Sequence, residues 1–426
     1  MRVGILTTFA DLHESYSLIG VVLDQCGMLR QQGVDFALFV NEPGPRLNTQ
    51  SMNSVEWIQP FLRREVPTGD LREDVIDDDL RQRTANWLRG ICQEFDVLVT
   101  HDWAFTTWNV SYNQAMRDVA EEFPGVTWVH WVHSAPGDRP NRLLGAQALR
   151  YTIMPNSLYV YLNFAHRIRY AESLGTDVSK ISVCYNPMDA AAFLGCGAEA
   201  TTFIHEHRLW DREIMQVYPI SMPRAAAKGL DKLIGIFGEW KRLGYRVKLV
   251  VVNAHCNAPA EQKFAESYRL MAREDWNLTE SDLVFTSDRP GWEYTVPHDV
   301  VSQLFRLSNV FVFPTVSEAC SRVLQEASLA GCMVVGNDSF SPMYEFLDPS
   351  VPRFTFGALG VNVEYPLGKD QWLREVAKAL TPYLEHPMFR QQSHMLRLSA
   401  WETIWREQFQ PILRRAVAMT EERRAA

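Results

Sequence analysis

The sequence predicts an α/β fold made of two doubly wound, Rossmann-like domains. The chain of 426 residues is long for one hydrophobic core and suits two domains of ordinary size. Short runs of apolar and β-branched residues alternate with segments of helical period along most of its length. Such alternation is typical of βαβ units, whose parallel strands bind ligands at their carboxyl ends.

The composition places the protein in a broad class. With 46% hydrophobic and 22% charged residues, the chain has the composition of an ordinary soluble globular protein. The net charge of −9 gives no overall electrostatic footprint for nucleic acid. The seven cysteines are scattered without a CxxC pair, so we expect reduced, mostly buried thiols rather than disulfides or a zinc site. No signal peptide or membrane-spanning run is present, and we expect a cytoplasmic protein.

The first domain is expected over residues 1–192. It opens with a buried strand at Val3–Leu6, a helix over Ser17–Gln32 and a second strand at Phe36–Val40. The stretch Tyr151–Ser157 predicts a strand and a helix N-cap. A helix over Tyr161–Leu174 and a strand at Ile181–Tyr185 follow, and the poorly periodic stretch 193–212 predicts a linker.

Two further strands of this domain deliver histidine to the sheet edge where a ligand would bind. One ends at His101, followed by Asp102 and Trp103, and the other ends at His133. We expect a functional role for His133 because of its place at the strand end. His130 falls on the opposite strand face by alternation, and we expect it to satisfy a local hydrogen bond.

Tryptophans are concentrated around these two strands. Their rings supply stacking surface for sugars or bases, but we expect burial in the core or at a subunit interface to account for most of them. The residues are Trp103, Trp108, Trp128 and Trp131.

The second domain is expected over residues 213–385. Its first strand, Met215–Ile220, leads into Arg224 and Lys228 and then into a helix from Leu230. Two cations at a strand-to-helix junction suit a phosphate or pyrophosphate, although solvated surface charge would explain them as well. Further elements are predicted at Lys248–Asn253, Asp282–Thr286 and His298–Leu307.

The stretch Val310–Gly336 forms a complete βαβ pattern. An apolar run, a Pro-Thr-Val-Ser break, a helical segment, the Ala330-Gly331 stop and a second β-branched run follow one another. Glu318 lies at the mouth of this unit, and Glu326 lies about two turns down its helix.

The order of these motifs resembles that of the glycogen synthase-like donor domain of retaining glycosyltransferases of the GT-B fold, family four. The resemblance covers about Met1 to Leu347 and implies that the first domain binds the acceptor. The residues that carry it are Arg224, Lys228, Gly229, Pro314, Glu318, Glu326, Ala330 and Gly331, together with Asn186–Asp189, Phe193, Thr100–Asp102 and His133.

The resemblance implies a role for each donor-site residue. Glu326 would accept hydrogen bonds from the ribose hydroxyls, and Glu318 would lie by the transferred sugar. Arg224 and Lys228 would neutralise the leaving diphosphate, so that neither a metal nor a cofactor is required. The backbone amides that would face the sugar or phosphate are those of Ala319, Cys320, Ser321 and Arg322.

Three further expectations follow from the same resemblance. Cys320-Ser321 stands where the family commonly has an aromatic residue and a glycine, so we expect the sugar pocket to differ there. Gly20 is the candidate for close backbone approach to the donor phosphates, and His101, Asp102 and Trp103 are candidates for the acceptor side, with His133 in a catalytic role.

The last part of the chain is predicted to be helical. Helices are expected over Gln371–Leu384 and Met388–Ala418, and residues 386–426 are expected to pack back on the first domain. Trp401 and Trp405, four apart on one helix face, would anchor this segment by burial.

Together these observations predict a retaining, metal-independent hexosyltransferase that uses a UDP- or GDP-linked sugar. The acceptor could be a glycan, a small molecule or a lipid-linked sugar. One alternative is a DNA glycosyltransferase acting on hydroxymethylated bases, with tryptophans stacking a flipped base. Another is a non-catalytic nucleotide-sugar-binding protein. The sequence leaves the sugar, the acceptor and the oligomeric state open.

Overall fold

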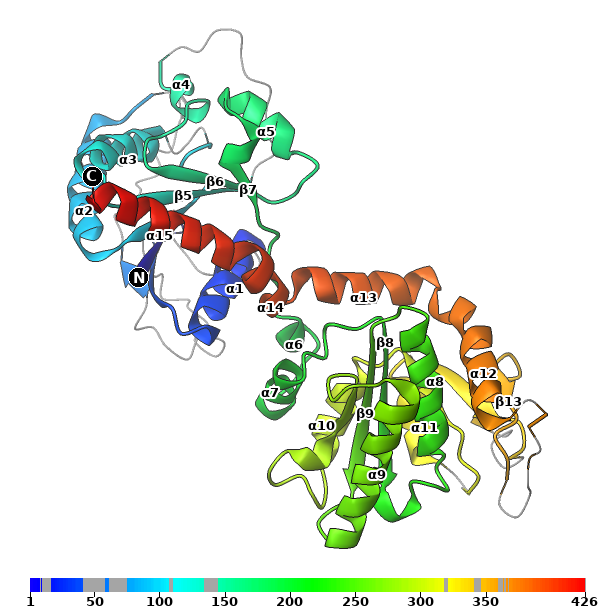
Figure 1. The fold of residues 1–426 in the computed structure, drawn as a ribbon. Coiled ribbons are helices and arrows are strands. Elements are labelled where there is room, and N and C mark those ends of the chain that lie inside the picture. Colours follow the sequence, from blue (N-terminus) through cyan, green and yellow to red (C-terminus); the bar gives the residue numbers. More distant parts are fainter. Residues whose placement is uncertain are drawn as a thin grey trace. The chain divides into compact units, whose positions relative to one another are not determined.

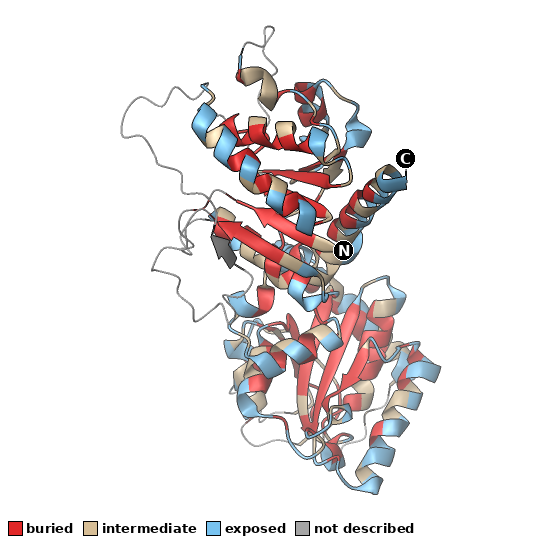
Figure 2. Cartoon of the chain, turned by 90° about the vertical axis from the view of Figure 1, so that its left-hand side faces the viewer, coloured by how far each residue is buried: buried red, intermediate tan, exposed pale blue. Residues whose placement is uncertain are grey.

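The computed structural model describes most of the chain. It covers residues 1–7, 9, 17–40, 58–60 (backbone only), 75–106, 110–133, 145–317, 321–340, 346–358, 363, 365–366 and 368–425. The chain divides into two compact units, of which the first comprises Met1–Asp189 with Leu398–Ala426 and the second Ala190–Arg397. Each unit consists of parallel strands covered by helices, with buried strands and with helices exposed on their outer faces (Figure 2). The predicted α/β class with two Rossmann-like domains is confirmed.

The first unit contains one parallel sheet in the order β3-β2-β1-β4-β5-β6-β7. Its strands are β1 Arg2–Leu6, β2 Asp35–Val40, β3 Ile58–Pro60, β4 Val97–His101, β5 Thr127–Val132, β6 Ser157–Tyr161 and β7 Ile181–Val183. Its helices before the C-terminal segment are α1 Ser17–Gln31, α2 Asp78–Glu94, α3 Val110–Glu122, α4 Gln147–Arg150 and α5 Arg167–Leu174.

Both faces of this sheet are covered because its strands are apolar on both sides. Ile5 packs in one cluster with residues of α1 and of the C-terminal helix, whereas Leu6 packs in a second cluster with residues of α2 and α3. This alternation is the period of a strand buried on both faces. The arrangement leaves the carboxyl edge of the sheet to the loops that follow the strands.

The C-terminal helix returns to the first unit, as predicted. The segment predicted to do so, residues 386–426, begins too early, because residues up to Arg397 belong to the second unit. The segment that leads to it consists of α13 Pro387–Ser399, α14 Trp401–Ile404 and a π-helical turn Trp405–Phe409, and it ends in α15 Gln410–Ala425. Residues of α15 pack beside α1 and β5 in the core (Figure 1). Trp401 and Trp405 pack on this core, and a side chain at Gly27 would clash with the Trp401 indole. The Met188 amide donates to the Ser399 carbonyl at 3.0 Å, where the chain leaves and re-enters this unit.

The second unit contains two three-stranded parallel sheets, ordered β10-β9-β8 and β11-β12-β13. The strands are β8 Ile214–Ser221, β9 Val247–Ala254, β10 Leu283–Phe285, β11 Val310–Val312, β12 Met333–Asn337 and β13 Arg353–Phe354. The helices are α6 Ala190–Phe193, α7 Ala198–Glu206, α8 Leu230–Arg242, α9 Pro259–Trp276, α10 His298–Phe305, α11 Arg322–Leu329 and α12 Lys369–Leu384. The strand–helix–strand pattern predicted for Val310–Gly336 is confirmed by β11, α11 and β12.

Side chains join these two sheets between β8 and β11. The Gln216 amide donates to the Val312 carbonyl and accepts from the Val312 N–H, both at 2.9 Å. Asn309 accepts from the Met215 N–H at 2.9 Å. These carboxamides stand in for a main-chain ladder, so the six strands run as β10-β9-β8-β11-β12-β13. The order reverses between β8 and β11, which is where doubly wound sheets bind ligands.

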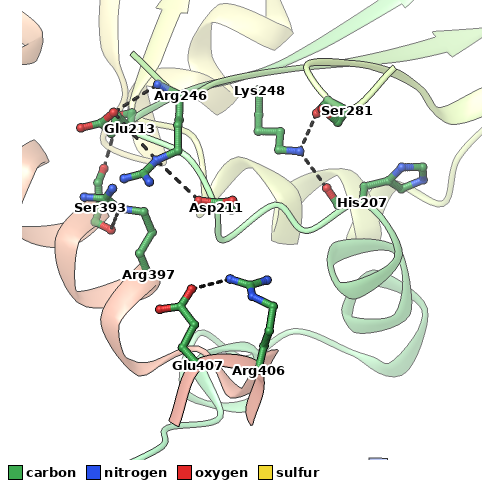
Figure 3. Close-up of polar contacts among 10 residues, drawn as sticks. All are labelled: His207, Asp211, Glu213, Arg246, Lys248, Ser281, Ser393, Arg397, Arg406 and Glu407. Atoms are coloured by element: carbon green, nitrogen blue, oxygen red, sulfur yellow. Dashed lines mark hydrogen bonds and ion pairs between the residues drawn. The ribbon is translucent and has the colours of Figure 1, made fainter. Parts of the chain in front are cut away.

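Helix α7 falls within the stretch 193–212 that the sequence predicted as a linker. Ala200, Phe203 and Ile204 of this helix are buried, and the helix belongs to the second unit. Figure 3 shows the Lys248 ammonium of β9 donating to the carbonyl oxygens of His207 and Ser281, at 3.0 and 2.5 Å. This buried lysine therefore ties the end of α7 to the residues before β10.

The strand predicted at Tyr151–Ser157 and the predicted start of the next helix at Tyr161 are wrong, whereas the end of that helix at Leu174 is confirmed. The strand there is β6, Ser157–Tyr161, and the following helix begins only at Arg167. Asn156 adopts a φ of 55° and donates to the Ala120 carbonyl, so the turn lies where the sequence predicted a strand and an N-cap. The run from Leu158 to Tyr161 is buried on both faces, and a short buried strand has the same apolar pattern as a buried helix segment.

Two general properties follow from the described residues. None of their helices is both long and apolar enough to cross a membrane. Five of the cysteines are buried free thiols, namely Cys26, Cys92, Cys184, Cys256 and Cys332.

Candidate functional site

The loop after β8 is held against the loop after β11 in the second unit. Gly229 precedes α8 with a φ of 71°, in the left-handed region that favours glycine. A Cβ at this position would lie 2.8 Å from both the Cγ and the carbonyl oxygen of Pro314. The Val316 amide also donates to the Ala227 carbonyl at 3.0 Å. The glycine is therefore required both for its backbone conformation and for the close approach of the two loops.

Arg224 and Lys228 converge at this junction. The Arg224 guanidinium donates to the Ser317 carbonyl oxygen at 3.2 Å, and the Lys228 ammonium donates to the same oxygen at 3.3 Å. Lys228 is buried, with its ammonium 5.9 Å from the centre of the Phe313 ring, whereas Arg224 is exposed. Two cations therefore meet at the carboxyl ends of β8 and β11. This position suits a polyanion such as a diphosphate.

Glu326 of α11 belongs to a small charged cluster in the same unit. Its Oε1 atom lies 2.9 Å from His298 Nε2 and 3.0 Å from Arg322 Nε. Ser321 caps α11, because its hydroxyl accepts from the Leu324 amide at 3.2 Å. His298 starts α10 and was not singled out in the sequence. It and Glu326 are 28 positions apart and on different helices, so no local motif marks their contact.

His101, Asp102 and His133 lie together in the first unit, at the ends of β4 and β5. His101 Nδ1 is 2.8 Å from His133 Nε2, and the His133 amide donates to Asp102 Oδ1 at 2.8 Å. Burial lowers the pKa of His133 to about 4 and holds the pKa of His101 well below its usual value. Both rings are therefore neutral near pH 7, and one of them has to donate to the other.

His130 has the local role that the sequence suggested. It is completely buried, with Nδ1 2.9 Å from the Thr100 hydroxyl and Nε2 3.0 Å from the Ser157 hydroxyl. Burial lowers its pKa to about 3. Both ring nitrogens are thus used within the core.

The structure corrects the acceptor-side role expected for Trp103. Its indole is completely buried, with its ring centre 4.9 Å from that of Tyr112, so it forms part of the core. Trp128 and Trp131 are also completely buried. None of these three tryptophans therefore offers a stacking surface. Trp108 lies outside the described residues.

Gly20 is the remaining predicted site residue that the structure describes. Gly20 lies in the first turn of α1 and is exposed, and no atom lies within 4 Å of the point that a Cβ would occupy there. Glu318, Ala319 and Cys320 fall outside the described residues. Over the described parts of the chain, no group of three histidine, cysteine or acidic residues could hold a metal ion.

Comparisons with known proteins give distant structural matches. No model of a protein family and no curated protein matches the chain. The structure of Anabaena Alr3699/HepE with UDP-glucose is 14% identical, with 98% of this chain and 100% of that chain covered and a TM-score of 0.37. A glycosyltransferase from Rickettsia africae ESF-5 is 13% identical, with 99% and 98% covered and a TM-score of 0.36. Sucrose-phosphate synthase of Thermosynechococcus elongatus is 13% identical, with 98% and 99% covered and a TM-score of 0.35. At such values, function has to be argued from the residues of the site.

Proposed function

We propose that this protein is a retaining, metal-independent glycosyltransferase that moves a hexose-like sugar from a UDP- or GDP-linked donor to an acceptor hydroxyl. The observation that carries the proposal is the convergence of Arg224 and Lys228 on the Ser317 carbonyl. This convergence lies where the strand order of the second unit reverses. A nucleotide ligand of a doubly wound sheet binds at that point.

Arg224 and Lys228 would act on the leaving group. As the bond between the sugar and the diphosphate breaks, negative charge grows on the diphosphate. Interactions that strengthen with this charge raise the rate of the chemical step. Two fixed cations supply the charge that a divalent metal supplies in other phosphate sites. Lys228 is buried and already oriented by the Ser317 carbonyl, so little reorganisation is needed.

Glu326 would bind the ribose of the donor. Oε1 already accepts from Arg322 Nε at 3.0 Å and lies 2.9 Å from His298 Nε2, and these contacts hold the carboxylate in one orientation. The second oxygen, Oε2, would accept from a ribose hydroxyl. Glu318 would lie at the transferred sugar, as the family resemblance implies.

The first unit would bind the acceptor, with His101, Asp102 and His133 at the carboxyl edge of its sheet. A glycan, a small molecule or a lipid-linked sugar remain the acceptor classes. Burial of Trp103, Trp128 and Trp131 removes most of the stacking surface that motivated DNA as an acceptor. The five buried free thiols support a reducing, cytoplasmic location.

The test begins with donor binding. Thermal unfolding of the whole protein is measured with a panel of UDP-, GDP- and ADP-linked sugars, since a ligand that binds only the folded state raises the Tm. We expect at least one UDP- or GDP-sugar to raise the Tm, and Lys228→Ala to abolish this shift. Lys263→Ala, at an exposed position of α9, is the matched control.

The best donor is then tested for transfer to glycan, small-molecule, lipid-linked and hydroxymethylated DNA acceptors. Anomeric configuration of the product is read by NMR, and transfer is repeated with a chelator. If no nucleotide sugar raises the Tm, the proposal is overturned. An inverted product or a loss of transfer with the chelator would contradict the retaining or metal-independent part alone.

A further inference from the structure

The contact between His101 and His133 places one shared hydrogen between two neutral rings. His101 Nδ1 and His133 Nε2 are 2.8 Å apart, and the ring planes are inclined by 26°. A neutral imidazole carries one N–H and one acceptor nitrogen. Therefore only two arrangements satisfy this contact, and they differ in which ring donates.

The surroundings of His101 distinguish these two arrangements. His101 is 2% exposed, and its Nε2 is buried with no hydrogen-bond partner among the residues that the structure describes. If His133 donated, the His101 hydrogen would lie on Nε2 as a buried N–H without an acceptor. If His101 donates from Nδ1, only an acceptor nitrogen is left unsatisfied. Buried N–H groups without partners are the rarer of the two in folded proteins.

Hydrogen bonds made by Asp102 fix the position of the His133 main chain. Asp102 Oδ1 accepts from the His133 amide at 2.8 Å, and the Asp102 amide donates to the Trp131 carbonyl at 2.9 Å. Asp102 adopts a φ of 61°, and its carbonyl accepts from the Thr106 hydroxyl at 2.7 Å. The Trp131 indole stacks on the His101 ring at 6.1 Å between ring centres. Both rings are thus placed by the ends of β4 and β5.

We propose that His101 is a positioning residue that holds His133 as its Nδ1–H tautomer. The Nδ1–H of His133 then serves as a neutral hydrogen-bond donor to an oxygen of the sugar substrate. This last step rests on the proposed function, whereas the tautomer does not. His133 would orient or stabilise a substrate oxygen, and it would not act as a general base.

The test reads the tautomer directly. Long-range ¹H–¹⁵N spectra of ¹⁵N-histidine-labelled full-length protein distinguish protonated from unprotonated ring nitrogens, and the His133→Gln spectrum assigns the His133 signals. We expect His133 to be protonated on Nδ1 alone at pH 7.5. A His133 that is protonated on Nε2 overturns the proposal, whatever the activity.

Two variants at His101 test the positioning role. His101→Asn keeps an N–H donor near the Nδ1 position, and His101→Phe keeps a ring without a donor. We expect His101→Phe to show an Nε2–H signal at His133 and at least a tenfold lower kcat. His101→Asn should keep His133 mostly as the Nδ1–H tautomer and should retain most of the wild-type kcat. Nearly equal tautomer spectra for the two variants would contradict the positioning role.

The readouts separate failure of this inference from failure of the proposed function. If no nucleotide sugar is a substrate but His133 is the Nδ1–H tautomer, the donor role toward a sugar falls and the tautomer assignment stands. If His101→Phe does not fold, the wild-type and His101→Asn spectra still decide the tautomer. His130 is an internal standard. Both of its ring nitrogens are hydrogen-bonded to hydroxyl groups in the core, so its signals should not change in either variant.

Discussion

The ammonium of Lys228 lies 3.3 Å from the carbonyl oxygen of Ser317, so that a cation following β8 meets the main chain following β11. The residues that bring them together are Gly229 and Pro314, whose close approach leaves no room for a side chain at Gly229. Donor binding at the proposed site would therefore depend on the packing of two loops as well as on charge.

Gly229→Ala is expected to destabilise the second unit and weaken donor binding. The added methyl group meets Pro314 and the left-handed φ is strained, so we expect a loss of about 2–4 kcal/mol in the free energy of unfolding. Gly244→Ala, after the other end of α8, is the control: its φ is 97°, and no atom lies within 4 Å of an added Cβ. That variant carries the φ strain alone. Equal urea midpoints for the two variants would show that the contact with Pro314 contributes little.

Arg224→Ala is expected to weaken binding of the nucleoside diphosphate. A hydrogen bond to a charged group contributes about 1.5–3 kcal/mol, which corresponds to roughly 10- to 150-fold in Kd. The loss should shrink as salt is added, since Arg224 is exposed. Calorimetric titration with UDP and GDP measures both effects, and Arg273→Ala on α9 is the exposed control. An unchanged Kd would remove Arg224 from the site.

Glu326→Ala is expected to abolish discrimination between ribose and 2′-deoxyribose donors. A site that hydrogen-bonds a hydroxyl rejects the ligand that lacks it, because its own polar group is left unpaired. The wild-type protein should bind UDP at least tenfold more tightly than 2′-deoxy-UDP, and the variant should bind both alike. Glu280→Ala, an exposed position before β10, should behave as wild type. Discrimination that survives in Glu326→Ala would mean that another residue holds the ribose.

Stability should fall as the pH drops from about 6.5 towards 4 because of buried histidines. The native pKa of His133 is about 4 and that of His130 about 3, whereas an unfolded histidine titrates near 6.5. Between these values the unfolded state binds protons that the native state does not, so acid favours unfolding. The shift of His133 alone corresponds to about 3 kcal/mol. Urea unfolding at pH 7.5, 6 and 5 should show that the free energy of unfolding falls less on acidification for His133→Gln than for the wild type.

Asp24 is expected to oppose this loss. Burial raises its pKa to about 7, although the hydrogen bond that Asp24 Oδ1 accepts from the Asp189 amide acts in the opposite direction. Between about pH 7 and 4 the native state therefore holds a proton that the unfolded carboxyl has lost, and acid favours folding. Asp24→Asn should be more stable than the wild type at pH 8 and should lose stability more steeply on acidification. An acid slope equal to that of the wild type would contradict the raised pKa.

The sequence correctly predicted the features that depend on short-range residue patterns. The strand–helix–strand pattern of Val310–Gly336, the cations after the first strand of the second domain and the apolar C-terminal helix all depend on residue period and spacing over short distances. The stretch after Tyr151 was mispredicted for the same reason, since a short buried strand and a buried helix segment have similar patterns. The burial of Trp103 could not be read from its neighbours, because an indole suits both a core and a binding surface.

The order of residues was enough to predict the α/β class, the two domains and the strand ends near which Lys228, His101 and His133 lie. Which of these side chains meet became clear only from the folded chain. The contact of His101 with His133 and that of His298 with Glu326 join residues 32 and 28 positions apart. Such contacts depend on the order and register of strands and on helix packing, which are set by burial of the whole core rather than by any local pattern.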